Sequence, residues 1–383
     1  MNRLRLMRMW GGIWAAGACI LAAIVGCDRG ATAETPVRRV EVAEAHTGDA
    51  KGRTETAEPP KKEVEQEGLL IGEYRLADNP VVDGDTIRVE DVEGSIRLLS
   101  IDTEEKLRGK ANRAAAEKDF GKYLKGKRGN APRPQKAGTP MGEEATEFAE
   151  AFFKGEEVVR LERDDPKEIR GYFGRLLAFA FVKKNGRWMS YNVECVRAGM
   201  SPYFTKYGYS HRFHNQLTHA EAEARQAKRG IWNPDAQGYG DYDERKAWWN
   251  ARADFIRAFE HEANRRDDYI QLTHWDAPAE LEDQLGREVT VLSTVDKIQH
   301  FRGLVRVSLA GQRGRGFPVI FFDKDVFRQS GIDRYRREPI AVRGTVERYE
   351  KGSYRTLQVV VKEPAQVLLP RLPWPDDVKQ AAE

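Results

Sequence analysis

The chain has 383 residues, of which 40% are hydrophobic, and this length allows two domains with hydrophobic cores as well as tails. Its 63 Lys and Arg residues nearly balance its 60 Asp and Glu residues, so the formal net charge is only +3. The net charge therefore gives no indication of a nucleic-acid partner. A nucleic-acid binding site must be sought in local clusters of basic residues.

The first 27 residues have the features of an export signal. Three arginines within the first eight residues precede an apolar run at 9–26, which ends in the sequence IVGC. This ending resembles the lipobox of bacterial lipoproteins, which implies cleavage before Cys27 and lipid on its thiol. An ordinary signal peptide and an uncleaved anchor helix are the alternatives. All three export the chain, and lipidation predicts a membrane anchor facing the periplasm or the exterior.

Residues 28–68 contain hardly any large apolar side chain and are rich in Ala, Glu, Lys, Thr and Pro. Such a segment cannot bury enough surface to fold, so we expect a disordered tether. With Cys19 in the signal peptide and Cys27 lipidated, only Cys195 remains, which excludes an internal disulfide and a cysteine metal site. The apolar helical pattern around Cys195 predicts a core residue.

The first folded region, residues 69–235, contains predicted strands in series and three helices. Apolar and β-branched runs predict strands over 81–90, 96–102, 156–164 and 174–182, with a hairpin at Asn185-Gly186. Apolar residues at helical spacing predict helices over 142–153, 191–199 and 214–229. This order predicts a mainly β fold in which helices cap a small barrel.

A strongly basic insertion at 106–140 interrupts the predicted barrel. It holds eleven Lys and Arg residues, and Glu117 and Asp119 are its only acidic residues. Its first half has helical character, whereas its second half is rich in Gly and Pro and predicts a loop. The insertion is either an electrostatic arm that recruits a polyanion or a solvated, flexible segment.

A charged helix is predicted over 242–266, within a helical linker at 236–284. Its apolar stripe is expected to pack against a neighbouring domain rather than form a ligand site. The stripe consists of Trp248, Ala251, Phe255 and Phe259.

The region at 285–370 predicts five strands with a helix after the third, which is the order of an OB barrel, and a tail follows at 371–383. Arginines on and between these strands, together with Phe301, Tyr349 and Tyr354, suit single-stranded nucleic acid. A structural or protein-binding barrel is the alternative, because folds of this type serve many roles.

Two aspartates stand one residue apart in the sequence VVDGDTIRVE. Asp83 and Asp85 would point to the same side of an extended chain, where like charges repel. Two explanations fit this spacing: an Asp-Gly hairpin turn, or a hard cation that neutralises the pair.

Further polar residues frame the strands of this region. Arg97 opens a predicted strand, the sequence DTEE at 102–105 closes it, and Arg175 begins an apolar strand after a glycine. Carboxylates, a Thr carbonyl and water suit Ca²⁺. Two arginines suit the oxygens of a phosphodiester, and a spare glutamate can accept a proton from water. Together these groups can hydrolyse a phosphodiester.

At these residues the chain resembles the staphylococcal nuclease-like (thermonuclease) family. The matching segments, in the family's order, are VDGDTI, RLLSIDTEE, GEEA, GYFGRLLA and AEAEARQAKRGIW, within residues 71–232. Each alone is a weak signal, whereas their order and spacing together are strong. The resemblance implies an OB-type five-stranded barrel with three helices. It also implies calcium-dependent cleavage of DNA and/or RNA with little sequence preference, leaving 3′-phosphate ends.

The resemblance also assigns roles to particular residues. Asp85, Asp102 and the backbone carbonyl of Thr103 fall on the family's calcium ligands. Asp83 falls on a nearby carboxylate that shapes the field of the metal without binding it. Glu105 falls on the presumed general base, which holds the attacking water.

Arg97 and Arg175 fall on the two arginines that bind the scissile phosphate in this family. Tyr203 and Tyr207 are candidate counterparts of tyrosines that hold the nucleotide, with core packing the alternative for at least one of them. Glu104 departs from the family, which has proline there. This change is expected to loosen the loop that carries the general base and to place a like charge beside it.

The resulting hypothesis is an exported, membrane-tethered, calcium-dependent nuclease that acts on DNA and/or RNA and has no predicted protein partner. The alternative is a non-catalytic lipoprotein that uses the same barrels as a scaffold to bind nucleic acid or protein. The seven histidines do not show the spacing of metal ligands, so they are expected to be surface or core residues.

Overall fold

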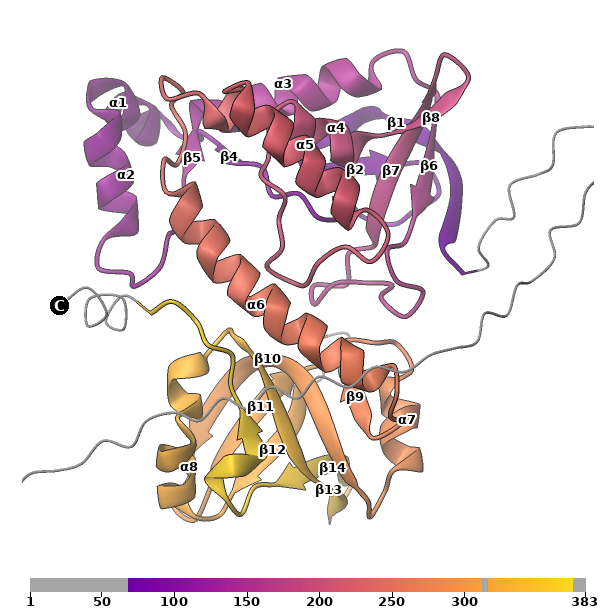
Figure 1. The fold of residues 1–383 in the computed structure, drawn as a ribbon, viewed down its shortest axis with the longest axis vertical. Coiled ribbons are helices and arrows are strands. Elements are labelled where there is room, and N and C mark those ends of the chain that lie inside the picture. Colours follow the sequence, from indigo (N-terminus) through magenta and orange to yellow (C-terminus); the bar gives the residue numbers. More distant parts are fainter. Residues whose placement is uncertain (1–67, 312–313, 315, 375–383) are drawn as a thin grey trace, which may run out of the picture. The chain divides into compact units, whose positions relative to one another are not determined.

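The computed structural model describes residues 68–311, 314 and 316–374 (Figure 1). The predicted signal peptide with Cys27, nearly all of the predicted tether and most of the predicted tail lie outside these residues. Within the described ranges, the helices are all too short or too polar to cross a membrane.

The first domain is built on a sheet whose strands pair in a closed ring. Pairing runs β1–β2–β3–β7–β6 and back to β1, and β8 extends the sheet beside β7. Only the β3–β7 pair in this ring is parallel. The strands are β1 (Leu70–Asp83), β2 (Thr86–Val89), β3 (Ile96–Leu98), β6 (Val158–Glu162), β7 (Leu177–Lys184) and β8 (Arg187–Ser190). Their inward side chains form the core of the domain, which includes Cys195 as predicted.

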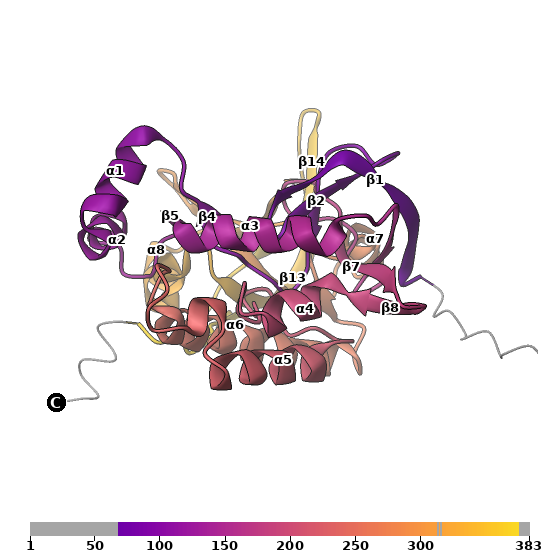
Figure 2. The ribbon, with the colours of Figure 1, turned by 90° about the horizontal axis from the view of Figure 1, so that it is seen from above.

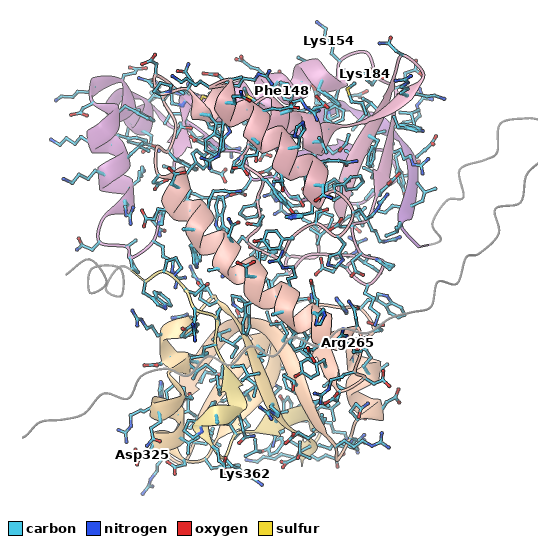
Figure 3. The ribbon with its side chains drawn as sticks, in the orientation of Figure 1. Phe148, Lys154, Lys184, Arg265, Asp325 and Lys362 are labelled. Atoms are coloured by element: carbon cyan, nitrogen blue, oxygen red, sulfur yellow. The ribbon has the colours of Figure 1, made fainter. Side chains whose placement is uncertain are left out.

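Three helices accompany this sheet, as predicted: α3 (Pro140–Phe153), α4 (Tyr191–Arg197) and α5 (His214–Gln226), followed by the short helix η1 (Gly230–Trp232). The Thr139 hydroxyl caps the start of α3 by accepting a hydrogen bond from the Gly142 amide (3.2 Å). At the other end, the Lys184 ammonium donates to the Phe152 carbonyl (2.8 Å). Figure 3 shows Lys184 near Lys154, the residue that follows α3. A cation at that end is favourable because helix carbonyls are exposed there.

Two turns with left-handed backbone shape the sheet. The β7–β8 hairpin turns at Asn185 and Gly186, both with positive φ (51° and 78°), which confirms the predicted hairpin. The strand predicted over 96–102 is shorter, because the chain leaves β3 and turns at Ser100 (φ 60°). Asn192 holds this turn by donating to the Leu99 carbonyl (2.8 Å).

The basic insertion is a helical hairpin whose two ends lie side by side. It contains β4 (Glu105–Lys106), α1 (Lys110–Lys118), α2 (Phe120–Arg128) and β5 (Gly138–Thr139), with a loop at 129–137. The ends are joined because β4 and β5 pair in parallel. Ala116 and Tyr123 pack in an apolar cluster with Met141 and Tyr239 from outside the insertion. The prediction of a helical half followed by a loop is therefore confirmed, and the insertion has a packed face.

Helix α6 (Tyr242–Ala263) packs against both strand-rich regions. Trp249 contacts Phe204 of the first domain (ring centroids 4.9 Å apart), whereas Phe259 clusters with Leu292 of the second. The prediction that this helix packs against a neighbouring domain is confirmed. The predicted stripe misses several buried residues, because a helix with neighbours on two sides buries more than one stripe. Its buried residues are Tyr242, Arg245, Trp249, Arg252, Ala253, Ile256 and Phe259.

The second strand-rich region repeats the pairing order of the first. Pairing runs β10–β11–β12–β14–β13 and back to β10, and the β12–β14 pair is parallel. The five strands and the helix after the third appear as predicted. The elements are β10 (Glu288–His300), β11 (Val305–Ala310), β12 (Gly316–Phe321), α8 (Lys324–Ser330), η3 (Ile332–Tyr335), β13 (Pro339–Lys351), β14 (Tyr354–Val360), η4 (Pro364–Gln366) and β15 (Val367–Leu368).

Two elements of the predicted linker at 236–284 belong to this second sheet or lie beside it. They are β9 (Tyr269–Gln271) and α7 (Ala277–Asp283), and β9 pairs in parallel with β10. From above, the tip of the β13–β14 hairpin extends beyond the neighbouring ribbon (Figure 2).

Candidate active site

The turn between β1 and β2 places Asp85 in a buried position. The Asp83 carboxylate accepts a hydrogen bond from the Asp85 amide (3.2 Å), which stabilises this turn. A Cβ atom on Gly84 would lie only 2.7 Å from the Thr103 side chain, so glycine is needed for the close approach. Burial raises the pKa of Asp85 to about 6, although Arg97 acts in the opposite direction. The spacing of Asp83 and Asp85 is therefore that of a hairpin turn. Nearby cations stabilise the ionised form of the Asp85 carboxylate.

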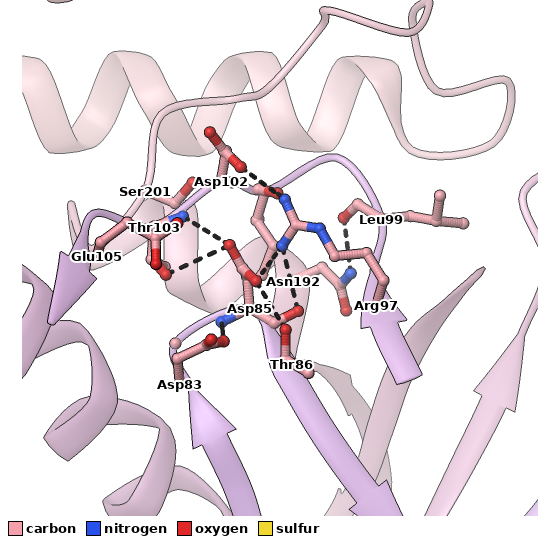
Figure 4. A network of polar contacts seen from close by, with 12 residues as sticks. Asp83, Asp85, Thr86, Arg97, Leu99, Asp102, Thr103, Glu105, Asn192 and Ser201 are labelled. Carbon is pink, nitrogen blue, oxygen red and sulfur yellow. Dashed lines mark hydrogen bonds and ion pairs between the residues drawn. The ribbon is translucent and has the colours of Figure 1, made fainter. Parts of the chain in front are cut away.

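Arg97, on β3, lies between the two predicted metal-ligand carboxylates (Figure 4). Its guanidinium forms ion pairs with Asp85 and, at 2.7 Å, with Asp102. It also donates to the backbone carbonyl of Ile101 (2.9 Å). Burial alone would lower the pKa of Arg97, but the two carboxylates outweigh this effect and raise it. Residues from the β1–β2 turn, from β3 and from the segment after β3 thus meet in one charged cluster.

Lys136, from the 129–137 loop of the basic insertion, is a member of this cluster that the sequence did not reveal. Its ammonium lies 2.9 Å from Asp102 Oδ1 and 3.3 Å from Glu105 Oε1. Burial acts to raise the pKa of Asp102, but Lys136 and Arg97 together outweigh it and lower that pKa. The loop therefore supplies a second cation to the predicted metal ligand and to the predicted base.

The charges in the cluster do not balance. Four carboxylates, those of Asp83, Asp85, Asp102 and Glu105, face two cationic groups, on Arg97 and Lys136. Lys206 is a third cation beside the cluster, because its charge also lowers the pKa of Asp102, so the carboxylates exceed the cations by one.

Several groups hold the carboxylates in place. The Thr103 amide and hydroxyl approach Asp85 Oδ2 (3.2 and 3.5 Å), and the Thr86 hydroxyl donates to Asp85 Oδ1 (2.9 Å). The Asp102 amide donates to the Ser201 hydroxyl (2.8 Å). The buried Tyr191 hydroxyl donates to the Gly84 carbonyl (2.7 Å). Ser201 and Tyr191 were not identified from the sequence, because neither belongs to a motif that points to this chemistry.

Glu104 corrects one expectation. Its carboxylate turns away from the cluster, is buried, and accepts hydrogen bonds from the Thr139 hydroxyl, the Tyr239 amide (2.8 Å) and the Tyr242 hydroxyl (2.7 Å). Burial raises its pKa, although these three donors act in the opposite direction. The expectation of a loosened loop was wrong, because Glu104 ties the chain next to Glu105 to β5 and α6.

The predicted base and the second predicted arginine are more exposed. The Glu105 side chain is 49% exposed, so water can reach its carboxylate. Arg175 makes no hydrogen bond or ion pair through its guanidinium with any other described residue. Leu177, two residues further on, pairs with Arg97 across β3 and β7, so Arg175 lies just before the strand that neighbours Arg97. The structure therefore brings Arg97, but not Arg175, into contact with the acidic cluster.

The two predicted nucleotide-binding tyrosines differ. Tyr203 is only 2% exposed, and its hydroxyl interacts with His214 Nδ1 (3.1 Å) and the Ser210 amide (2.8 Å). It is a core residue, which was the alternative expectation, and it cannot stack on a nucleotide in this conformation. Tyr207 is 68% exposed and lies beside the Lys206 ammonium (5.5 Å from its ring centroid), so it stays a candidate.

Few side chains are available to coordinate the predicted calcium ion. Within the ranges that the structure describes, no group of three or more His, Cys, Asp or Glu side chains is arranged to hold a metal ion. The predicted ligand set contains only two such side chains, Asp85 and Asp102, and its third member is a backbone carbonyl. Water would have to complete the coordination, as Ca²⁺ permits.

The match to a known family covers this site in part. Residues 95–234 match the model of the staphylococcal nuclease homologue family. None of the curated proteins compared with the chain matches it. The nuclease-homologue region, as we name residues 95–234, contains Arg97, Asp102, Glu105 and Arg175, and it begins after the turn that carries Asp85. The predicted nuclease-like domain is thus supported over most of its length.

Proposed function

We propose that the chain is a calcium-dependent nuclease that hydrolyses phosphodiester bonds of DNA and/or RNA and leaves 3′-phosphate ends. One observation carries this proposal: Asp85, Arg97 and Asp102 form one charged cluster, and Lys136 links Glu105 to it, largely within the nuclease-homologue region. Export and a lipid anchor at Cys27 are part of the proposal and rest on the N-terminal sequence alone.

The cluster suits a calcium ion in charge and in donor type. Asp85, Asp102 and the Thr103 carbonyl would hold the ion, and all three offer the oxygen ligands that Ca²⁺ prefers. The carboxylates of the cluster outnumber its cations, and this favours a positively charged ligand. When bound, the ion supplies positive charge that polarises a phosphoryl oxygen.

Side chains of the protein carry out the remaining steps of the proposed hydrolysis. Glu105 accepts a proton from the attacking water, whose oxygen forms the new bond to phosphorus. Arg97 and Arg175 donate to the phosphate oxygens and stabilise the charge that develops in the transition state. The bond to the 5′-oxygen breaks, and this oxygen leaves with a proton taken from solvent. Arg97 must release part of its present carboxylate contacts to make these new ones.

The purified chain should cut single-stranded DNA or RNA in the presence of calcium and not in the presence of a chelator. Electrophoresis of the fragments measures this, with Asp102→Asn as a variant that should lose cleavage because it removes a ligand charge. Equal cleavage with chelator would contradict metal dependence. Retained binding without any fragments would favour the alternative, a non-catalytic scaffold. That alternative has one observation in its favour, since Arg97 and Lys136 both donate to Oδ1 of Asp102, one of the predicted metal ligands.

Replacing Lys136 by Met should strengthen calcium binding. The ammonium competes for Asp102, and its loss adds one negative charge to the cluster. The side chain is 47% exposed, so solvent screens much of this effect. We expect about a tenfold lower Kd, or about 1.4 kcal/mol, measured by titration calorimetry with calcium.

Lys122→Met is the matched control, because Lys122 is an exposed lysine of the same insertion without an ion pair among the described residues. It should leave the Kd unchanged. Unchanged or weaker calcium binding by Lys136→Met would show that Lys136 does not compete for the ligands.

A further inference from the structure

We propose that the second barrel, residues 285–370, is an OB-type module that binds single-stranded nucleic acid. The proposed binding face consists of β11, the β10–β11 loop and the β13–β14 hairpin tip. This site is separate from the proposed nuclease site and does not depend on calcium.

Exposed aromatic side chains mark this face. Phe301 is 48% exposed, Tyr349 40% and Tyr354 47%. Tyr349 and Tyr354 lie on neighbouring strands of the hairpin, with ring centroids 6.2 Å apart. Large aromatic surfaces left in water at one site indicate a binding surface, and nucleic-acid bases stack on such rings whatever their sequence.

An arginine with an unused donor lies beside the tyrosines. Arg306, on β11, donates to the Tyr354 hydroxyl (3.3 Å). Its Nε atom is shielded from solvent and has no hydrogen-bond partner among the described residues. Gln299 pairs with Arg306 across β10 and β11, so the register places Phe301, two residues after Gln299, on the same face. A cationic donor thus lies beside stacking surfaces, as a phosphate backbone with attached bases requires.

The first domain, whose strands pair in the same order, offers a comparison for the β10–β11 loop. Its acidic cluster uses the β1–β2 turn, with Asp85, and β3, with Arg97. The corresponding loop of the second barrel, between β10 and β11, reads Phe-Arg-Gly-Leu at 301–304, with no carboxylate. Barrels of this type bind oligonucleotides on the second and third strands and on the loops after the first and fourth. The second barrel therefore keeps the binding position but lacks the acidic turn, which favours binding without cleavage.

The test measures affinity under conditions that prevent cleavage. The full chain is titrated into a fluorescein-labelled single-stranded oligothymidylate in chelator, and fluorescence anisotropy gives the Kd. The double variant Tyr349→Ala/Tyr354→Ala should raise the Kd about 10- to 100-fold, because each stacked base contributes substantially to affinity. Arg306→Gln should raise it less and reduce its dependence on salt. Measurement in an Arg97→Gln background removes the proposed phosphate contact of the first domain.

Phe322→Ala is the matched control, since Phe322 is a 60% exposed aromatic residue after β12, outside the proposed face. It should leave the Kd unchanged, and thermal melting should show that all variants fold. An unchanged Kd in the double tyrosine variant, with or without a loss in the control, would overturn the proposal and leave a structural or protein-binding barrel.

Cleavage assays on the same proteins separate this proposal from the proposed nuclease activity. Tyrosine-dependent binding without calcium-dependent cleavage would remove only the nuclease proposal. Calcium-dependent cleavage with tyrosine-independent binding would remove only the proposal for the second barrel.

Discussion

Glu105→Gln is expected to lower the rate of calcium-dependent DNA cleavage by about 10²- to 10⁴-fold, the usual contribution of a general base. Glutamine keeps the size of the side chain and can still accept a hydrogen bond from Lys136, which now lies 3.3 Å from Glu105 Oε1. It cannot accept the proton of the attacking water. Because Glu105 is not a predicted ligand, calcium and oligonucleotide affinities should change far less than the rate. Single-turnover cleavage measures the rate, and calorimetry and anisotropy measure the affinities.

Glu143→Gln provides the control for this substitution. Glu143 is a partly exposed carboxylate on α3, close in sequence to the end of the insertion, and it pairs only with Arg113 (3.2 Å) among the described residues. Its loss should leave cleavage unchanged. If Glu105→Gln cut DNA at the original rate, or lost affinity and rate equally, Glu105 would not be the base.

Glu338→Ala is expected to lower the free energy of unfolding by about 3–5 kcal/mol, because removing one partner of a buried ion pair leaves the other charge buried and unpaired. Glu338 is fully buried and forms ion pairs with Arg252, which is also buried, and with Arg133. The Trp248 Nε1 donates to the same carboxylate (3.1 Å). Burial, more than any other effect, lowers the pKa of Arg252 to about 9. Urea unfolding followed by both circular dichroism and tryptophan fluorescence measures the loss.

Two further variants test this interpretation. Glu350→Ala removes an exposed pair with Arg355 (3.6 Å) in the same barrel, and it should cost less than about 1 kcal/mol. Arg252→Met/Glu338→Leu should be more stable than Glu338→Ala, because one unpaired buried charge is removed with its partner. A loss in Glu338→Ala no larger than that in Glu350→Ala would contradict an essential buried network.

This network also explains how the second barrel reaches the candidate active site. The Arg133 guanidinium lies over the rings of Trp248 (4.6 Å) and Trp374 (4.1 Å). Arg133 precedes Lys136 by only three residues in the 129–137 loop. The same loop is therefore held by the second barrel at one position and contacts the acidic cluster at the other.

Short-range signals in the sequence predicted most of the elements. The Asn185-Gly186 turn, the helix ending at Phe153 and the five strands of the second barrel follow from local backbone preference and apolar periodicity. Periodicity served less well in α6, where Phe259 is the only buried member of the predicted stripe. A helix that contacts two domains has no single buried face for the pattern to reveal.

The order of the motifs along the chain was also enough to assign Asp85, Arg97, Asp102 and Glu105 to one site. It placed Glu104 wrongly beside the base, because the partners that bury its carboxylate come from β5 and the start of α6. Those partners lie up to 138 residues away and carry no local signal.

The sequence by itself thus determined the elements, which depend on neighbours along the chain. Its resemblance to a known family also named the residues of the acidic cluster. Only the tertiary structure decided which cations meet that cluster. Lys136 belongs to a loop without periodicity and lies 34 residues from Asp102, and its position depends on how the insertion packs. Electrostatic pairing acts through space, so a basic insertion in the sequence predicts excess charge but not the carboxylate that each lysine contacts.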